Sequence, residues 1–150
     1  MASSCQGLLL LGLVLGLLIS GDNVSVTAHY HATNAAITLA FLTLAYPLFA
    51  QLGMGQVNRL WAQRQLQPYF GGMVIYVAGM ALSGHLDVPR KVPMTTEGQQ
   101  ALAMGLMGFG GLIAICASLL LVAINLQAAR KHNKRPQHET GQRGQHETTM

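Results

Sequence analysis

His29 and His31 are the strongest candidates for metal or cofactor ligation in this chain. They lie in the stretch VTAHYHATNAAITLAF, which contains no charged residue. An imidazole in an apolar segment is costly to desolvate and therefore needs a partner. On an α-helix, residues two apart point about 200° away from each other, on nearly opposite sides. We therefore predict that the two histidines serve two separate centres and do not chelate one ion.

Arg90 and Lys91 form a second candidate group, directly after Pro89. A neutral imidazole is a common ligand of heme iron, and fixed cations are suitable partners for heme propionates. We expect both cations on the same side of a membrane as the histidines. This combination favours heme as the bound group.

Each group also has a simpler interpretation. The two histidines could instead be bonded to backbone carbonyls at a membrane interface. The two cations could be solvated loop charges balanced by Asp87 and Glu97. These alternatives stay open at the level of composition and spacing.

The composition indicates a membrane protein. Only 9% of the 150 residues are charged, whereas 51% are hydrophobic. No charged residue lies in 1–21, 23–58, 65–86 or 98–129. Each stretch reaches the roughly 20 residues that a helix needs to cross a bilayer. This pattern argues against a soluble enzyme, and the two separated cysteines argue against a disulfide framework or a cysteine metal site.

We predict an all-α, polytopic membrane protein with four transmembrane helices. They are expected over about 2–20, 25–52, 68–86 and 99–127. Together they form a four-helix segment over 1–128, followed by a disordered, basic cytoplasmic tail over 129–150. The first stretch is expected to be a retained span and not a cleaved signal peptide, because no Lys or Arg precedes its apolar core.

Several residues mark the expected ends and contacts of these helices. Gly53 and Gly55 are predicted to end the second helix, and Pro68 is predicted in the first turn of the third. Small residues allow close helix packing in membranes. Close approach is therefore expected at the glycines numbered 12, 16, 105, 108, 110 and 111.

The distribution of Lys and Arg predicts the orientation. Five of the nine follow residue 129, and two more lie between the second and third spans. Cytoplasmic segments carry an excess of these residues. Both termini are therefore expected in the cytoplasm, with 21–24 and 85–98 on the outer side. A clustered, folded basic surface for nucleic acid is not expected.

Two motifs resemble subunit I of the heme-copper oxidases. VTAHYHATNAAITLAF resembles the tenth helix of that subunit, whose His-x-His motif holds two hemes. GMALSGHLDVPRKVP resembles the end of the eleventh helix and the Pro-Arg-Arg loop after it. The resemblance covers about residues 7–128, or helices nine to twelve. It includes both cytochrome c oxidase subunit I and the nitric oxide reductase large subunit.

The resemblance implies a role for each candidate residue and assigns no catalytic side chain. His29 would be the proximal ligand of the high-spin heme iron, and His31 an axial ligand of the low-spin heme iron. Arg90 and Lys91 would hold propionates. Lys91 departs from the family's second Arg, which preserves the charge but loses bidentate pairing.

The same resemblance implies partners. In the family, the second low-spin ligand and the three copper-binding histidines come from earlier helices. We therefore expect a partial or split catalytic subunit of a respiratory terminal oxidase, in a bacterial or archaeal cytoplasmic membrane. It would share two hemes with the missing helices and take copper from a partner chain. Other oxidase subunits, membrane lipid and an electron donor such as cytochrome c or quinol would complete it.

Three alternatives remain for the function. The first is a nitric oxide reductase-type subunit. The second is a non-catalytic membrane b-type cytochrome. The third is a structural subunit without a cofactor.

Overall fold

Four helices make up the part of the chain that the computed structural model describes, which is residues 2–19, 24–86 and 98–134. They are α1 (Ala2–Leu17), α2 (Val24–Gln51), α3 (Arg59–His85) and α4 (Gly98–Lys134). No strand occurs in these ranges. The all-α prediction is therefore confirmed for the described residues.

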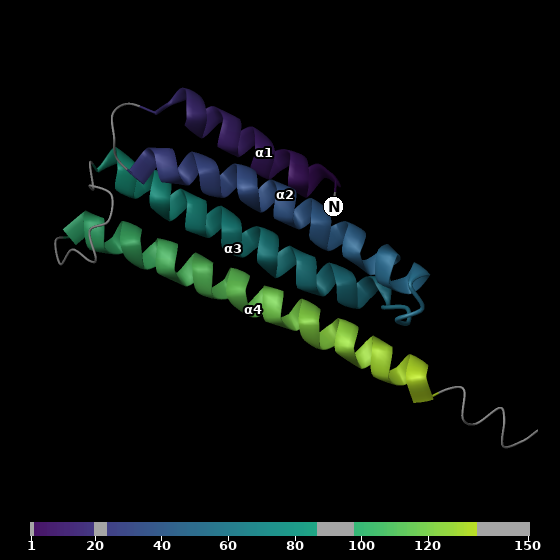
Figure 1. The fold of residues 1–150 in the computed structure, drawn as a ribbon. Coiled ribbons are helices and arrows are strands. Elements are labelled where there is room, and N and C mark those ends of the chain that lie inside the picture. Colours follow the sequence, from purple (N-terminus) through teal and green to yellow (C-terminus); the bar gives the residue numbers. More distant parts are fainter. Residues whose placement is uncertain (1, 20–23, 87–97, 135–150) are drawn as a thin grey trace, which may run out of the picture.

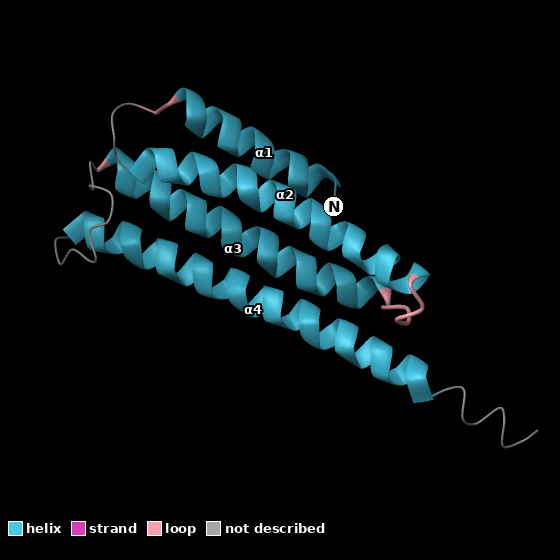
Figure 2. Ribbon diagram, in the orientation of Figure 1, coloured by secondary structure: helices cyan, strands magenta, loops and turns pink. Residues whose placement is uncertain are grey.

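The helices lie side by side in chain order and alternate in direction (Figure 1). α1 packs mainly against α2, α2 also packs against α3, and α3 packs most extensively against α4. The start of α1, the α2–α3 connection and the end of α4 share one end of the bundle (Figure 2). The start of α2 lies at the other end, so His29 and His31 belong to that end.

The second predicted helix agrees closely with α2. The helix begins at Val24 and continues past Pro47 to Gln51. Gly53 and Gly55 follow with φ of 71° and 90°. This left-handed region costs glycine no steric penalty, so the two glycines end the helix as predicted.

The third helix begins earlier than predicted. Asn58 caps it, since the Leu60 backbone N–H donates to the side-chain oxygen of Asn58 over 2.9 Å. That cap satisfies one of the unpaired amides at a helix start, so the helix includes the expected link from Arg59 onward. Pro68 consequently lies inside α3 and not in its first turn. The prediction for Pro68 was wrong.

The first and fourth helices also differ from their predicted lengths. α1 ends at Leu17, before the expected end near residue 20. α4 continues through Lys134 and so enters the segment that was expected to be disordered from 129. Ala128, Ala129, Arg130 and Lys131 are good helix formers, which explains the extension. Residues 135–150 lie outside the described part.

Alanine fills much of the buried core beside a few larger apolar side chains, whereas most of the large apolar side chains are exposed on the outer faces of the helices. The buried core includes Ala28, Ala32 and Ala36 of α2, with Ala103, Ala114 and Ala117 of α4. Leu and Phe side chains along α4 are exposed instead, for example Leu102, Phe109 and Leu119. Alanine and glycine at the contacts allow helix backbones to approach closely.

Two helices are long and apolar enough to cross a membrane. They are α2 and the Gly98–Asn133 part of α4. α1 is apolar, but its 16 residues extend only about 24 Å at 1.5 Å per residue. α3 is long enough, but it contains Arg59 and Arg64 in its first turns.

Gln65 joins three helices near the end of the bundle where α3 begins. Its side chain is fully buried. The Tyr46 hydroxyl of α2 donates to the Gln65 Oε1 over 3.1 Å, and the Gln65 Nε2 donates to the Ala117 carbonyl of α4 over 3.0 Å. Both functional atoms of this buried amide are thus hydrogen-bonded, and no buried side-chain nitrogen or oxygen among the described residues lacks a partner.

Replacing Gln65 with leucine is expected to destabilise the bundle while preserving side-chain volume. The change removes both hydrogen bonds and leaves the Tyr46 hydroxyl unpaired. Hydrogen bonds between membrane helices contribute about 0.6 kcal/mol each, so the free energy of unfolding should fall by about 1 kcal/mol. Unfolding in mixed micelles measures it. Gln67→Leu is the control, since Gln67 is exposed on the same helix. Equal losses from both substitutions would contradict the assigned role.

Candidate functional site

His29 faces α1. Its Nδ1 lies 2.7 Å from the carbonyl oxygen of Gly12. The ring also lies against Gly16, where an added Cβ would come within 2.8 Å of the same Nδ1. Gly12 and Gly16 therefore make room for this imidazole and for the α2 backbone beside it. Their predicted role in close helix packing is confirmed.

His31 faces α3 and α4. Its Nδ1 lies 3.0 Å from the carbonyl oxygen of Thr27, one turn earlier in α2. Its ring is 5.2 Å from the Tyr76 ring between centroids, at an interplanar angle of 52°. The imidazole is thus held by one contact within its own helix and by one aromatic neighbour on α3.

The two carbonyl contacts determine which ring nitrogen carries the proton. A carbonyl oxygen only accepts, so in each neutral imidazole the Nδ1 is the donor. Nε2 then keeps its lone pair. Metal-bound histidines commonly donate their other ring nitrogen to a carbonyl in this way, which orients the ring. Bonding to a backbone carbonyl was also the simpler interpretation from sequence, and the same contact serves both interpretations.

A cavity of about 390 Å³ lies beside His31. Tyr69, Met73 and Tyr76 of α3 form one wall. Gly111, Ala114 and Ser118 are among the α4 residues of the other. This volume is within the range of small-molecule sites, and the lining is mostly apolar. His29 lines neither this cavity nor the two cavities described below.

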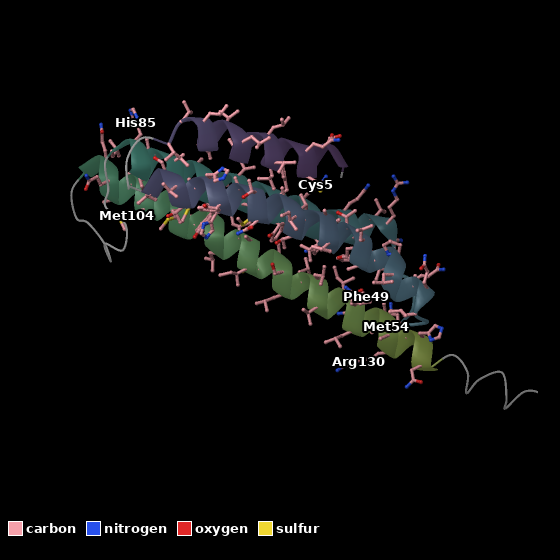
Figure 3. The ribbon with its side chains drawn as sticks, turned by 45° about the horizontal axis from the view of Figure 1, so that its top comes forward. Cys5, Phe49, Met54, His85, Met104 and Arg130 are labelled. Carbon is pink, nitrogen blue, oxygen red and sulfur yellow. The ribbon has the colours of Figure 1, made fainter. Side chains whose placement is uncertain are left out.

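The remaining candidate residues lie either outside the described part of the chain or away from this site. Arg90 and Lys91 lie outside the described part of the chain, as do Asp87 and Glu97. His85 is exposed at the end of α3 (Figure 3). Within residues 2–19, 24–86 and 98–134, no group of three His, Cys, Asp or Glu side chains is placed to hold a metal ion.

Sequence reasoning missed the residues around His31. Tyr69, Met73 and Tyr76 follow one another at spacings of four and three residues, which places them on one face of α3. That pattern was available, but it is equally typical of ordinary core packing. The sequence could not identify the carbonyl partners. Every helical residue has a carbonyl, and only the packing of α1 against α2 brings that of Gly12 to His29.

Comparison with known proteins gives one relative. No family model matches the chain, and no solved structure gives a match. An uncharacterized protein of Rickettsia prowazekii (strain Madrid E) is 30% identical over 133 aligned residues. The match covers 78% of this chain and 25% of the relative, so the chain spans about a quarter of that protein's length. The geometry of the two histidines therefore carries the functional argument.

Proposed function

We propose that this chain is a membrane-embedded, heme-binding segment of a heme-copper oxidase-type catalytic subunit. It works with helices that supply the remaining ligands, in a complex that transfers electrons to O2. The observation that supports the proposal most directly is the orientation of the two histidines. The His29 and His31 side chains point from α2 toward different neighbouring helices, and the Nδ1 of each contacts a backbone carbonyl. Two separately oriented imidazoles on one helix are what a bridge between two hemes requires.

Membrane insertion of all four helices is supported by where the apolar side chains lie. Large exposed hydrophobic residues occur on every helix, whereas alanine and glycine occupy the contacts between helices. Lipid tails make exposed leucine inexpensive, and small residues at contacts are typical of membrane bundles. The Arg59, Arg64, Arg130 and Lys131 side chains lie at the end we assign to the cytoplasm.

The residues near His31 fit a heme edge better than those near His29. His31 borders a mostly apolar cavity, and its ring is oriented by Thr27 and Tyr76. His29 instead packs against α1 at Gly12 and Gly16. Binding a high-spin heme on that side requires α1 to move away from the ring or a partner helix to take its place.

The chain's own contribution is to bind and orient. Heme supplies the one-electron chemistry, and copper from a partner chain completes the oxygen site. The Thr27 carbonyl holds the His31 imidazole proton at Nδ1 and thereby keeps its Nε2 available as a ligand. The Gly12 carbonyl does the same for His29 as long as α1 stays beside the ring. The apolar wall formed by Met73 and Ala114 excludes water from the His31 side. Arg90 and Lys91 are the proposed partners of propionates.

A heme spectrum tests the proposal. The chain is purified with the products of its neighbouring genes, and reduced-minus-oxidised spectra are recorded. We expect a Soret band that disappears in the double variant His29→Ala, His31→Ala. A spectrum that is unchanged by the double substitution, or a complex without any heme, would defeat the proposal. The second result would favour a structural subunit without a cofactor.

A non-catalytic b-type cytochrome is the second candidate. His31 is the only histidine among the described residues that borders the apolar cavity. A second copy of the chain could bring its own His31 to the same heme. A low-spin spectrum from the chain alone, without copper or oxygen uptake, would favour this function. Such a cytochrome would also need no movement of α1.

A further inference from the structure

Two adjoining cavities lie at the end of the bundle opposite to the histidines. The first has a volume of about 650 Å³ and is bordered by the α2–α3 connection and by Lys131 and His132 of α4. The second has a volume of about 410 Å³ and follows α4 from Lys131 to Leu120. Residues 56–58 and Lys131 border both cavities, so Lys131 stands where they meet.

The α2–α3 connection packs closely against α4 at one wall of these cavities. Gly55 has a φ of 90°, and an added Cβ there would come within 2.6 Å of the Ala128 carbonyl oxygen. Only glycine allows this backbone position. Asn58 then caps α3 directly beside the cavities. This part of the groove wall is thus set by the close approach of two backbone segments.

The groove changes from polar to apolar along α4. Lys131, His132 and Asn58 border its outer part. Ala123, Ile124 and Leu120 border its inner part, about two to three turns back from Lys131 toward the middle of the bundle. Trp61 forms the wall opposite to these apolar residues, and the Arg64 guanidinium lies 5.5 Å from the centre of its ring. Tryptophan beside a cation is typical of the lipid–water interface.

The charge at this end has one sign. Arg59, Arg64, Arg130 and Lys131 lie here, and the described ranges contain no acidic residue at all. All five acidic residues of the chain lie outside the described ranges. An anion is therefore attracted to the mouth of the groove without a competing carboxylate among the described residues.

We propose that this groove binds an anionic phospholipid, with its phosphate at Lys131 and an acyl chain along Ile124 and Leu120 beside Trp61. A phosphate suits the polar part, and an acyl chain suits the apolar part. A phospholipid carries both in the order that the groove presents, and basic pockets between helices on the cytoplasmic side are known to take such headgroups. The site rests on the proposed membrane insertion of α4 and is independent of heme ligation.

Lipid binding is measured on the full chain in a neutral detergent. Native mass spectrometry follows bound phosphatidylglycerol against phosphatidylcholine of the same acyl chains. We expect preferential retention of phosphatidylglycerol, and about fivefold weaker binding of it in Lys131→Gln, the effect of one basic residue at an anionic lipid surface. Ala123→Phe, which fills the apolar part, should also weaken phosphatidylglycerol binding while leaving the attraction of the cations in place.

Arg130→Gln is the matched control. It removes the same charge one residue earlier, but Arg130 borders neither cavity and points away from the α2–α3 side (Figure 3). Equal losses in Lys131→Gln and Arg130→Gln would overturn the site in favour of diffuse attraction. Competition by inorganic phosphate as strong as that by the lipid would overturn it in favour of a simple anion site. His31→Ala should leave lipid binding unchanged, which separates this test from that of heme.

Discussion

The His31→Ala variant is expected to lose the low-spin heme component completely while keeping the His29-dependent heme. An imidazole is the only iron ligand that this face of α2 offers, and alanine has no atom to replace Nε2. His31 and His29 are bonded to different carbonyls, of Thr27 and Gly12, so removal of one does not release the other. Reduced-minus-oxidised spectra and heme content per chain measure the outcome. We expect the heme content to fall by about half.

Two controls distinguish ligation from packing. His132→Ala removes an imidazole that borders the cavity at the opposite end and should leave the spectrum unchanged. Tyr76→Phe keeps the aromatic ring beside His31 and should preserve the low-spin heme. If His31→Ala and wild type gave the same heme content, the assignment of His31 would be wrong, whatever happened at His29. Loss of both hemes with retained helix content would show instead that the two sites are not independent.

The helices were largely predictable because their signals are local. A long uncharged stretch ended by Gly53 and Gly55 defined α2 almost to the residue. The start of α3 was missed because the polar residues after Asn58 were interpreted as a link. Asn58 was a capping signal ahead of a segment with high helix propensity, and the cap outweighed both the polarity and Pro68.

The candidate site was only partly predictable. The i, i+2 spacing placed His29 and His31 toward different neighbours, and the structure agrees. It did not indicate what each ring would meet, because the neighbours come from α1, α3 and α4. Periodicity within α2 contains no information about them. The cavity beside His31 lies between α3 and α4, whose backbones approach closely at Gly72, Gly79 and Gly110.

The glycines of α4 at which close packing was expected are of two kinds, in close contact with α3 or in open space. An added Cβ at Gly110 would collide with the Tyr76 backbone nitrogen and lie 2.7 Å from the Gly72 carbonyl oxygen. Gly105 and Gly108 have nothing within 4 Å of that position. The prediction of close packing is therefore confirmed at Gly110 and wrong at Gly105 and Gly108. Those two glycines face away from the neighbouring helix.

Replacing Gly110 with leucine is consequently expected to separate α3 from α4. The obstructing atoms belong to the α3 backbone, so no rotamer change can relieve the collision. Overpacking of a filled contact costs about 1–3 kcal/mol even where side chains can adjust, and we expect the upper end or more here. Unfolding in mixed micelles, followed by the fluorescence of the single tryptophan, Trp61, measures the loss.

For Gly108→Leu, on the same helix, we expect no loss of stability. Its new side chain enters open space, and leucine favours a helix by about 0.8 kcal/mol over glycine, so the variant should be as stable as wild type or slightly more so. The two substitutions add the same atoms to α4 two residues apart. A difference between them can therefore come only from what α3 presents to each position. If Gly110→Leu unfolded like Gly108→Leu, the close approach of the two backbones would be refuted, and with it the wall that closes the His31 cavity on the α4 side.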